Sequence, residues 1–529
     1  MSQMLKSSAA VAAATLISRM LGLVREMVFA RFMGTTWVAS AFLLAFQIPN
    51  LFRRLLGEGA LTAAFIPEFK HRERTEGDEA MWRAANGVLS GLVVVACAIT
   101  GLAILGVSIA MDRFAFDQRT ALMLDLLRIM FPYMILVCLA AVCMGMLNAR
   151  GRFFVPTLGA ALLNIVMIAS VLLVAPRFGK DRHEQIYALA FGVLAAGLAQ
   201  ALFQIPSLLS EGWRFQWVNP WSNPSVRIVA VRMIPTTLGA AAFQLNVLVT
   251  QSFAFAIGES VVASFQYAVR LMEFPQGVVG ASLGTYLLPT LAGLVADRKY
   301  DEFKKTLLTG LSHLMVVNLL SAALLMALAY PSVRLLFEGG IFHSSDTAGV
   351  AFALTLLAPG LVAFSTTNIL ARAFYALGDT KVPMQISIFC LAVNVVLSIA
   401  FSMSMQAAGL ALANTVTSTG NALLLAHALR RKLRGLDFAP LGREIAIMTA
   451  CALPSAVAAY ACHALLHRWT VGDSLFQRFL EVAVPGLVGV AIYLGIGLRT
   501  NLVPFKSLQE NFVRMARRLQ RSEKTPYSN

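Results

Sequence analysis

Between Gly87 and Met111 the chain reads GVLSGLVVVACAITGLAILGVSIAM, a run of 25 residues that contains no Asp, Glu, Lys or Arg. A helix needs about 20 apolar residues to cross the hydrocarbon core of a bilayer, so this segment is long enough to span a membrane. A second uncharged run extends from Thr306 to Val333, and a third, from Val382 to Leu429, is long enough for two spans with a turn within 402–409. Because lipid offers no hydrogen-bond partners, only helices and closed barrels span membranes, and runs this long and this apolar indicate helices.

The composition of the whole chain agrees with this class. Of its 529 residues, 58% are hydrophobic and 13% are charged, whereas a soluble domain carries about 25% charged residues. The six cysteines all lie in or at the ends of apolar segments and show no CxxC or Cys/His spacing. We therefore expect no disulfide, no metal site and no cofactor.

The N-terminal segment could be mistaken for a signal peptide, because Lys6 precedes an apolar, Ala-rich stretch. However, Arg19, Arg25 and Glu26 interrupt the apolar run, and we interpret it as a retained first membrane helix.

The hydropathy pattern predicts an all-α polytopic membrane protein with fourteen transmembrane helices. The predicted spans lie near 9–30, 36–56, 87–111, 121–148, 154–175, 186–209, 228–257, 261–295, 306–330, 347–375, 382–402, 407–429, 444–466 and 477–498.

The distribution of charge orients these spans. One face of the predicted topology holds 30 of the 43 Lys and Arg residues, including those of both termini, and the opposite face holds nine. The positive-inside rule therefore places both termini in the cytoplasm. We attribute the net charge of +16 to this topology and to contact with anionic lipid, and not to binding of nucleic acid. The segment 502–521 fits either an amphipathic helix on the inner leaflet or a disordered basic tail.

An internal repeat appears at a constant offset of 227 residues. Pro132, Gly151 and Val155-Pro156 recur as Pro359, Gly378 and Val382-Pro383. This offset equals six predicted spans, so the repeat relates spans 1–6 to spans 7–12 in parallel orientation and leaves two helices at the C-terminus. Transporters with paired bundles often bind substrate between the repeats, and the repeat therefore favours a transporter over a scaffold.

Several arginines lie inside the predicted spans, where each costs about 2.5–3.5 kcal/mol unless it faces water or a partner. The first span carries Arg19, Arg25 and Glu26, and span 8 carries Arg270 with Glu273 one turn later. The arginines outnumber these acids, and the excess positive charge suits a polyanionic substrate, since guanidinium groups bind phosphate oxygens bidentately. The alternative for Arg270 and Glu273 is a structural ion pair.

Three other features leave alternatives open. Arg53 and Arg54, at the end of span 2, either line a site or anchor the helix at the cytoplasmic interface. Arg128 is spaced to pair with Asp125 and is more consistent with a structural role. Pro275 predicts a broken or bent eighth helix, which either serves transport or is a simple kink.

The motifs around these charges resemble those of one family. The stretch from Leu5 through SRMLGLVRE (18–26), the stretch IPNLFRRLLGEGAL (48–61) and the stretch RLMEFPQGV (270–278) are similar to the lipid II flippase family MurJ, also called MviN. The resemblance covers nearly the whole chain. It implies the fold of the multidrug/oligosaccharidyl-lipid/polysaccharide exporter superfamily, in which two six-helix lobes surround a central cavity.

The resemblance also implies a substrate and site residues. The substrate would be the undecaprenyl-diphosphate-linked disaccharide-pentapeptide used for peptidoglycan synthesis, carried across the bacterial inner membrane by a protein that we expect to be a monomer. The residues that match substrate-binding positions of the family are Arg19, Arg25, Arg53, Arg270, Ser18 and Arg54. Those expected to serve gating or coupling are Glu58, Glu273 and Glu26. Two positions depart from the family: Ser40 and Val269 stand where members often have aspartate, which puts a role of those acids in cation coupling in doubt.

The predicted division of the chain follows from the repeat and the resemblance. Residues 1–215 and 216–435 form the two lobes, 436–500 form two helices with a groove for the polyprenyl tail, and 501–529 form the cytoplasmic tail. The alternatives in transport are a flippase for another polyprenyl-diphosphate oligosaccharide or a drug exporter of the same superfamily. An exporter of cationic drugs should line its cavity with acids. An enzyme is disfavoured because the seven histidines are scattered and Asp-rich pairs are absent from the cytoplasmic loops.

Overall fold

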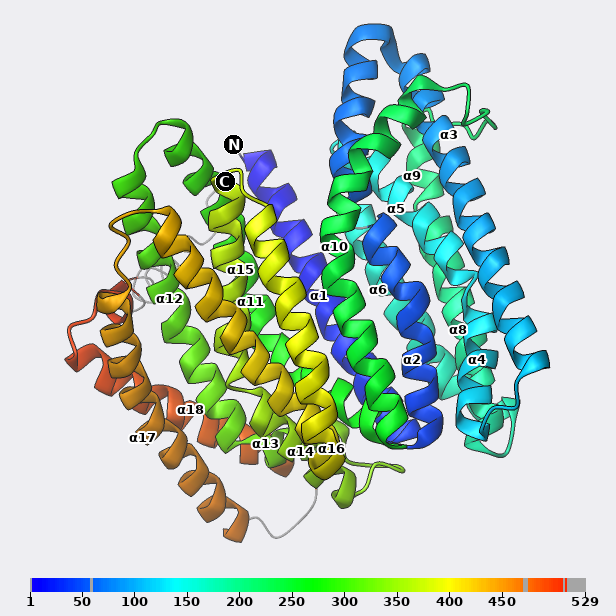
Figure 1. Cartoon of the computed structure of the whole chain (residues 1–529). Coiled ribbons are helices and arrows are strands. Elements are labelled where there is room, and N and C mark those ends of the chain that lie inside the picture. The colour runs from blue at the N-terminus through cyan, green and yellow to red at the C-terminus, as the bar shows by residue number, and fades with distance from the viewer. Residues whose placement is uncertain (1, 58–59, 470–473, 508–509, 511–529) are drawn as a thin grey trace, which may run out of the picture. The chain divides into compact units, whose positions relative to one another are not determined.

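The computed structural model describes residues 2–57, 60–469, 474–507 and 510. Across these ranges the chain folds into helices, with no strand and one isolated bridge between Gly339 and Phe342. The helices form two compact units (Figure 1): unit 1 comprises Met1–Ala263 and Gly339–His343, and unit 2 comprises Ser264–Glu338 and Ser344–Asn529. The four-part division drawn from the sequence stays a prediction.

Unit 1 contains the N-terminal helices. They are α1 (Ser2–Met33), α2 (Trp37–Phe52), the π-helical turn η1 (Arg53–Gly57), α3 (Ala60–Arg113), α4 (Gln118–Met130), α5 (Tyr133–Ala149), α6 (Phe154–Ala169), the π-helical turn η2 (Ser170–Val174), α7 (Ala175–Phe178), α8 (Arg182–Leu202), α9 (Ile205–Ser210) and α10 (Pro224–Ile257). Side chains cap three of the described starts in this unit: Thr36 accepts a hydrogen bond from the Ala39 amide at α2, Asp117 accepts one from Thr120 at α4, and Asn223 accepts one from Ser225 at α10. A core around Phe65 joins α3 to α5.

Unit 2 contains the remaining helices. They are α11 (Val261–Ala296, whose first turn belongs to unit 1), α12 (Tyr300–Ala327), α13 (Ala329–Phe337), α14 (Ser344–Leu357), α15 (Gly360–Ala376), α16 (Lys381–Lys432), α17 (Ala439–Trp469) and α18 (Leu475–Arg499). Figure 1 shows α17 and α18 beside α12. The Tyr493 hydroxyl of α18 donates to the Val316 carbonyl of α12 at 2.9 Å, within a core that also buries Phe505.

The hydrogen bonds of the backbone reproduce the internal repeat. In unit 1 the Phe131 amide donates to Leu127, and the Arg152 amide donates to Leu147, both at 2.8 Å. At the offset of 227 residues in unit 2, the Ala358 amide donates to Leu354 at 2.8 Å and the Asp379 amide donates to Phe374 at 2.9 Å.

The same two regions share their bends and turns. The helix pair α4–α5 is bent by 40° and the pair α14–α15 by 44°. The glycines that end these pairs, Gly151 (φ 80°) and Gly378 (φ 73°), both have the positive φ that favours glycine. The repeated motif is therefore a repeated structure, although the pairing of all six spans stays a prediction.

The membrane character of the chain is confirmed at a coarser level than the predicted count. Among the described residues, seven helices are long and apolar enough to cross a membrane, or up to nine if each bent pair is one span. The total of fourteen therefore stays a prediction. The turn expected within 402–409 is confirmed, because Gln406 inside α16 has non-helical backbone angles (φ 48°, ψ −124°).

Of the broken or bent eighth helix that Pro275 predicted, the break is contradicted and the bend stays a prediction. The helix α11 continues through Pro275 and Pro289 from Val261 to Ala296 and is not broken. A proline removes one backbone donor, and a helix in a membrane protein tolerates this loss where neighbouring groups satisfy the freed carbonyl. The predicted surface helix 502–521 lies largely outside the described residues, as does Glu58.

Candidate functional site

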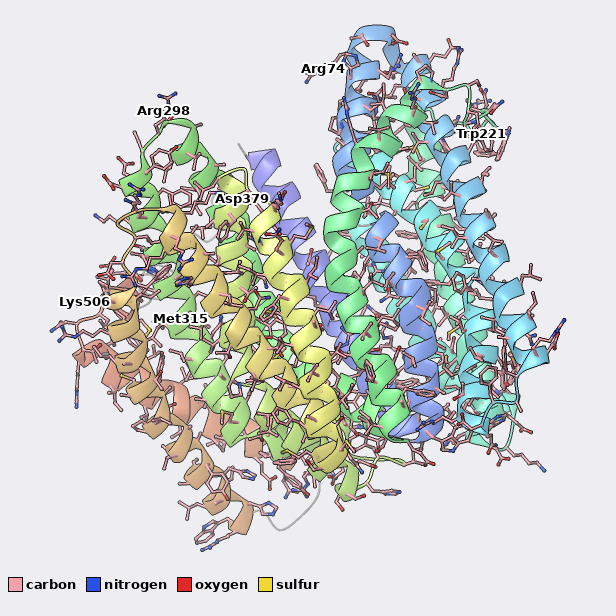
Figure 2. The ribbon with its side chains drawn as sticks, in the orientation of Figure 1. Arg74, Trp221, Arg298, Met315, Asp379 and Lys506 are labelled. Atoms are coloured by element: carbon pink, nitrogen blue, oxygen red, sulfur yellow. The ribbon has the colours of Figure 1, made fainter. Side chains whose placement is uncertain are left out.

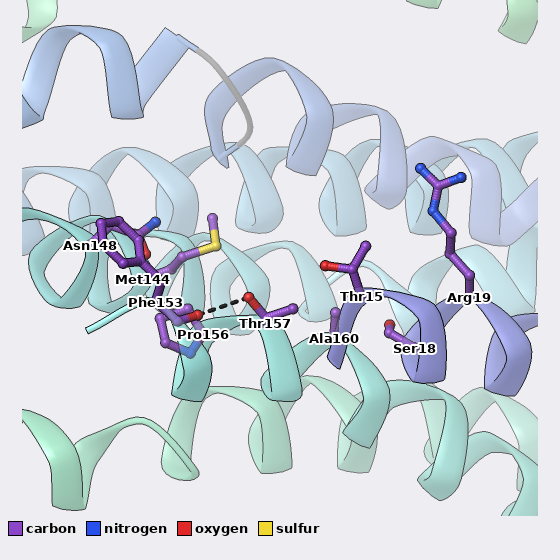
Figure 3. Close-up of a pocket in the computed structure, with 9 residues that line it drawn as sticks. All are labelled: Thr15, Ser18, Arg19, Met144, Asn148, Phe153, Pro156, Thr157 and Ala160. Atoms are coloured by element: carbon purple, nitrogen blue, oxygen red, sulfur yellow. Dashed lines mark hydrogen bonds between the residues drawn. The ribbon is translucent and has the colours of Figure 1, made fainter. Parts of the chain in front are cut away.

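A pocket of about 620 Å³ lies in unit 1 between α1, α5 and α6 (Figure 3). Its lining comprises Thr15, Ser18, Arg19, Met144, Asn148, Phe153, Pro156, Thr157 and Ala160. Figure 3 shows Arg19 at one end of the pocket and Asn148 at the other, with the hydroxyls of Thr15 and Thr157 between them. The pocket therefore offers one cation and several neutral hydrogen-bonding groups.

The wall of this pocket is set by a contact between α1 and α6. The Asn164 side-chain amide of α6 donates to the Ser18 carbonyl of α1 at 3.2 Å. Gly22, one turn later, lies beside the same side chain, and a Cβ there would make only an ordinary contact with its amide nitrogen, at 3.7 Å. Ser18 thus contributes its backbone to the packing and lies beside Arg19 on the pocket.

Arg19 and Arg25 differ in their surroundings. The Arg19 side chain is exposed, and within the described part of the chain its guanidinium has no hydrogen-bond or ion-pair partner. The Arg25 guanidinium, in contrast, contacts the buried Glu26 carboxylate at 2.5 Å. The excess positive charge predicted for the first span is therefore carried by Arg19.

The arginines after α2 lie on a π-helical turn that widens the helix. The Arg53 Nε donates to the Asn50 side-chain oxygen at 2.7 Å, one turn back on α2. The Arg54 guanidinium donates to the Gln244 side chain of α10 at 3.3 Å and is only partly exposed. Both arginines are thus tied to protein groups of unit 1, and the choice between lining a site and anchoring the helix stays open.

The remaining predicted site residues lie as follows. In unit 2, Arg270 pairs with Glu273 at 2.9 Å, and both side chains remain substantially exposed. The buried Ser40 hydroxyl accepts a long hydrogen bond, 3.4 Å, from the Ala263 amide at the start of α11. In unit 1, Arg128 pairs with Asp125 at 2.6 Å, as the sequence predicted.

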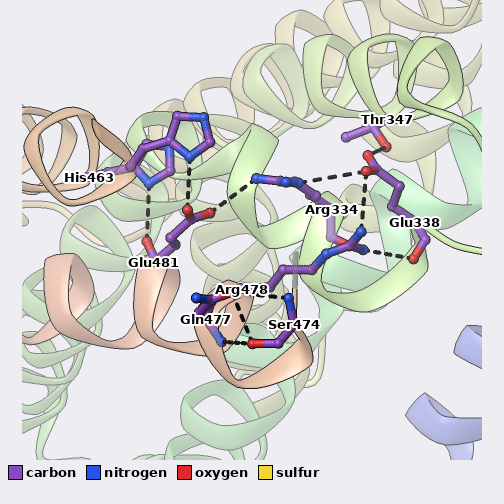
Figure 4. Close-up of polar contacts among 9 residues, drawn as sticks. Arg334, Glu338, Thr347, His463, Ser474, Gln477, Arg478 and Glu481 are labelled. Carbon is purple, nitrogen blue, oxygen red and sulfur yellow. Dashed lines mark hydrogen bonds and ion pairs between the residues drawn. The ribbon is translucent and has the colours of Figure 1, made fainter. Parts of the chain in front are cut away.

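A buried ionic network in unit 2 was missed by the sequence analysis (Figure 4). The Glu481 side chain on α18 is 4% exposed and accepts from the Arg334 guanidinium at 3.2 Å and from His467 Nδ1 at 2.8 Å. His463 on α17 contacts the Glu481 carbonyl at 3.2 Å. The sequence did contain one indication of this network, because Glu481 is an acid inside the predicted span 477–498.

The same network continues to α14. Arg478 donates to the Glu338 carbonyl at 3.0 Å, and Thr347 donates to the Glu338 carboxylate at 2.6 Å. Arg334 lies 3.6 Å from that carboxylate as well. These contacts hold α17 and α18 against α13 and the start of α14.

Comparison with known protein families assigns the chain to one of them. The model of the family described as "Lipid II flippase MurJ" matches residues 29–480. The chain belongs to the lipid II flippase family MurJ. A MurJ relative of Buchnera aphidicola, described as a probable lipid II flippase, is 31% identical over 94% of this chain and 98% of its own length.

Two further comparisons agree. The lipid II flippase MurJ of Burkholderia cenocepacia is 34% identical over 79% of this chain and 82% of its own length. A solved MurJ structure in an inward closed conformation matches with a TM-score of 0.73 at 22% identity, over 92% of this chain and 97% of its own. The MurJ family is named for translocation and not for catalysis, in keeping with the prediction that the chain is not an enzyme.

Proposed function

We propose that this chain translocates lipid II, the polyprenyl-diphosphate-linked peptidoglycan precursor, from the cytoplasmic to the outer leaflet of the bacterial inner membrane. Membership of the MurJ family carries the proposal, together with the exposed Arg19 guanidinium, which has no partner among the described residues, beside the polar pocket of α1, α5 and α6. A guanidinium fork keeps its proton at any working pH and matches the geometry of phosphate oxygens.

In this proposal the arginines bind the diphosphate and replace part of its lost hydration. Arg19 supplies a cation that pairs with no described residue, and Arg53 and Arg54 add charge in the same unit. Arg25 and Arg270 are held by Glu26 and Glu273. A bound diphosphate would compete with these two acids for their guanidinium groups, so that substrate binding changes the ion pairs and favours a change of conformation.

The neutral groups of the pocket suit the rest of the headgroup. Sugar and peptide groups are recognised by neutral donors and acceptors, which Asn148, Thr15 and Thr157 provide. The polyprenyl tail would remain in lipid, along the exposed apolar side chains of α17 and α18 such as Val457 and Leu487. The two lobes would alternate in access as a monomer with both termini in the cytoplasm.

Replacing Arg19 tests the proposal in a host whose own lipid II flippase can be depleted. We expect Arg19→Ala to fail to support growth, with lipid II accumulating in the inner leaflet, followed by lysis. Arg19→Lys should restore activity only in part, because an ammonium keeps the charge but loses the bidentate geometry. Arg128→Ala is the matched control, since its guanidinium already pairs with Asp125, and it should grow like the parent.

The decisive readout is the export of precursor by protein that is shown to be inserted in the membrane at parental amounts. Normal export and growth by Arg19→Ala would refute the role of this residue. Accumulation of a different polyprenyl-diphosphate oligosaccharide, with lipid II export unchanged, would favour the alternative flippase. Loss of resistance to cationic drugs alone would favour a drug exporter.

A further inference from the structure

The loop 211–223, which joins α9 to α10, is fastened along one side of α3. The buried Trp213 donates from its indole nitrogen to the Asn86 side-chain oxygen at 2.8 Å. The Asn86 amide in turn donates to the Arg214 carbonyl at 2.9 Å. The Val218 amide donates to the Ser90 hydroxyl at 3.3 Å. Because these hydrogen bonds all involve one short stretch of α3, they fix the position of the loop along the axis of that helix.

Two glycines of α3 lie in close contact with the end of the loop. A Cβ at Gly87 would lie 2.3 Å from the Asn223 side-chain nitrogen, and a Cβ at Gly91 would lie 3.2 Å from the Pro220 ring. A side chain at either position would therefore force the end of the loop to shift. Asn223 also donates to the Arg83 carbonyl at 3.3 Å, so the loop is held over the whole stretch 83–91.

Along this stretch the exposed surface of α3 changes from charged to apolar. Before it, the Glu79 side chain is 90% exposed and paired with Arg83. After it, the exposed side chains of α3 are apolar, from Val95 to Leu102, which is 70% exposed. At 1.5 Å of rise per residue, Arg83 and Val95 are about 18 Å apart along the helix axis. The loop is bound between them, where the predicted span 87–111 begins.

The outward face of the loop is aromatic and basic. Phe215, Trp217 and Trp221 are 55%, 59% and 79% exposed. Figure 2 shows Trp221 projecting from the end of unit 1 that also carries Arg74. Arg214 is exposed in the same loop, and the sequence from 212 to 232 contains no acid. Indole rings favour the boundary between headgroups and acyl chains, and arginines there attract anionic lipid.

We propose that residues 213–221 form an interfacial anchor that inserts Phe215, Trp217 and Trp221 into the headgroup region of the bilayer. Arg214 contacts the phosphates of anionic phospholipid. The anchor ends just before Pro224, where α10 begins, and therefore sets the depth of this long helix in the membrane. Its partner is the lipid surface itself, and it does not depend on which substrate the chain carries.

Nitroxide depth measurements in vesicles test the anchor. A spin label is attached at Trp217→Cys or Trp221→Cys, with Glu79→Cys as the aqueous reference and Leu102→Cys as the reference for the hydrocarbon core. The parent for all four carries Cys97→Ser and Cys462→Ser, because the other four cysteines are buried. The ratio of oxygen to nickel-reagent accessibility at positions 217 and 221 should lie between the two references.

Two outcomes overturn the proposal. Labels at 217 and 221 that are as accessible to the nickel reagent as the label at 79 would place the loop in water. Labels protected from both reagents would show that protein covers it. Adding phosphatidylglycerol to phosphatidylcholine vesicles should move the 217 label deeper, and Arg214→Gln should abolish that shift. An unchanged shift in Arg214→Gln overturns the assignment of this arginine. Each labelled protein must keep the parental melting temperature, so that misfolding is separated from a change of depth.

Discussion

Replacing Glu481 should destabilise unit 2 more than any exposed ion pair can. The variant Glu481→Gln keeps the shape of the side chain but removes the negative charge that Arg334 and His467 contact at 3.2 and 2.8 Å. Removing one partner of a buried ion pair costs about 3–5 kcal/mol, because the other charge stays buried. Arg334 retains Glu338 at 3.6 Å, and the new amide can still accept a hydrogen bond.

The loss of stability expected for Glu481→Gln is therefore smaller than that of a fully broken buried pair. It is about 2–3 kcal/mol, near the contribution of a hydrogen bond to a charged group. Since 1 kcal/mol shifts the Tm of a unit of this size by about 2–4 °C, the Tm in detergent should fall by about 4–12 °C. The control Glu79→Gln removes an ion pair whose acid is 90% exposed. It should change stability by less than about 1 kcal/mol, as surface pairs do.

A double variant identifies the cause. In Glu481→Gln/Arg334→Met the remaining buried charge is also removed, so part of the lost Tm should return, and the two effects should not add. A Tm of Glu481→Gln that equals that of the parent would refute the reasoning. So would strictly additive losses in the double variant, because they would show that Glu481 and Arg334 do not interact energetically.

Two further changes have expected outcomes that the structure fixes. Gly340→Ala places a Cβ 2.2 Å from the Arg31 carbonyl oxygen at a φ of +60°, and should lower the Tm of the detergent-solubilised protein by the equivalent of about 1–3 kcal/mol. Gly349→Ala, which has nothing within 4 Å of the added carbon, should leave it unchanged or raise it, and equal effects would contradict the clash. The hydrogen bond from Arg152, followed by that from Arg150, holds the pKa of Glu211 below its ordinary value. Its contribution to stability is therefore present above the ordinary carboxyl pKa and is lost as the pH falls through the lowered one. Glu211→Gln should accordingly lower the Tm near neutral pH and not in strong acid, and a pH-independent loss would refute this origin.

The helices were predictable because their chemistry is local. The uncharged run from Gly87 to Met111 lies inside α3, and the turn around Gln406 interrupts α16 where the small and polar residues indicated it. The ion pair of Arg128 with Asp125 followed from a spacing of one helical turn.

The residues that the sequence analysis missed depend on contacts between distant helices. The pocket joins Thr15 of α1 with Asn148 of α5 and Thr157 of α6, and no periodicity in one segment indicates such a meeting. Glu481 was visible as an acid within a predicted span, but its partner Arg334 is 147 residues away. Of the break or bend expected at Pro275, the break does not occur, because a missing donor does not by itself interrupt a helix that its surroundings support.

The two copies of the repeated turn show which property the fold requires there. In unit 1 the turn is basic, and Arg150 and Arg152 contact the acid Glu211 at 3.3 and 2.8 Å. In unit 2 the corresponding turn is acidic, and Asp379 pairs with Lys432 at the end of α16. The backbone hydrogen bonds of the two turns are the same, whereas the signs of their ion pairs are reversed. The turn therefore has to be fastened to a neighbouring element, but the fold does not prescribe which side carries the positive charge. In unit 1 the positive charge belongs to the turn itself, so each unit meets the same backbone requirement with its own arrangement of charge.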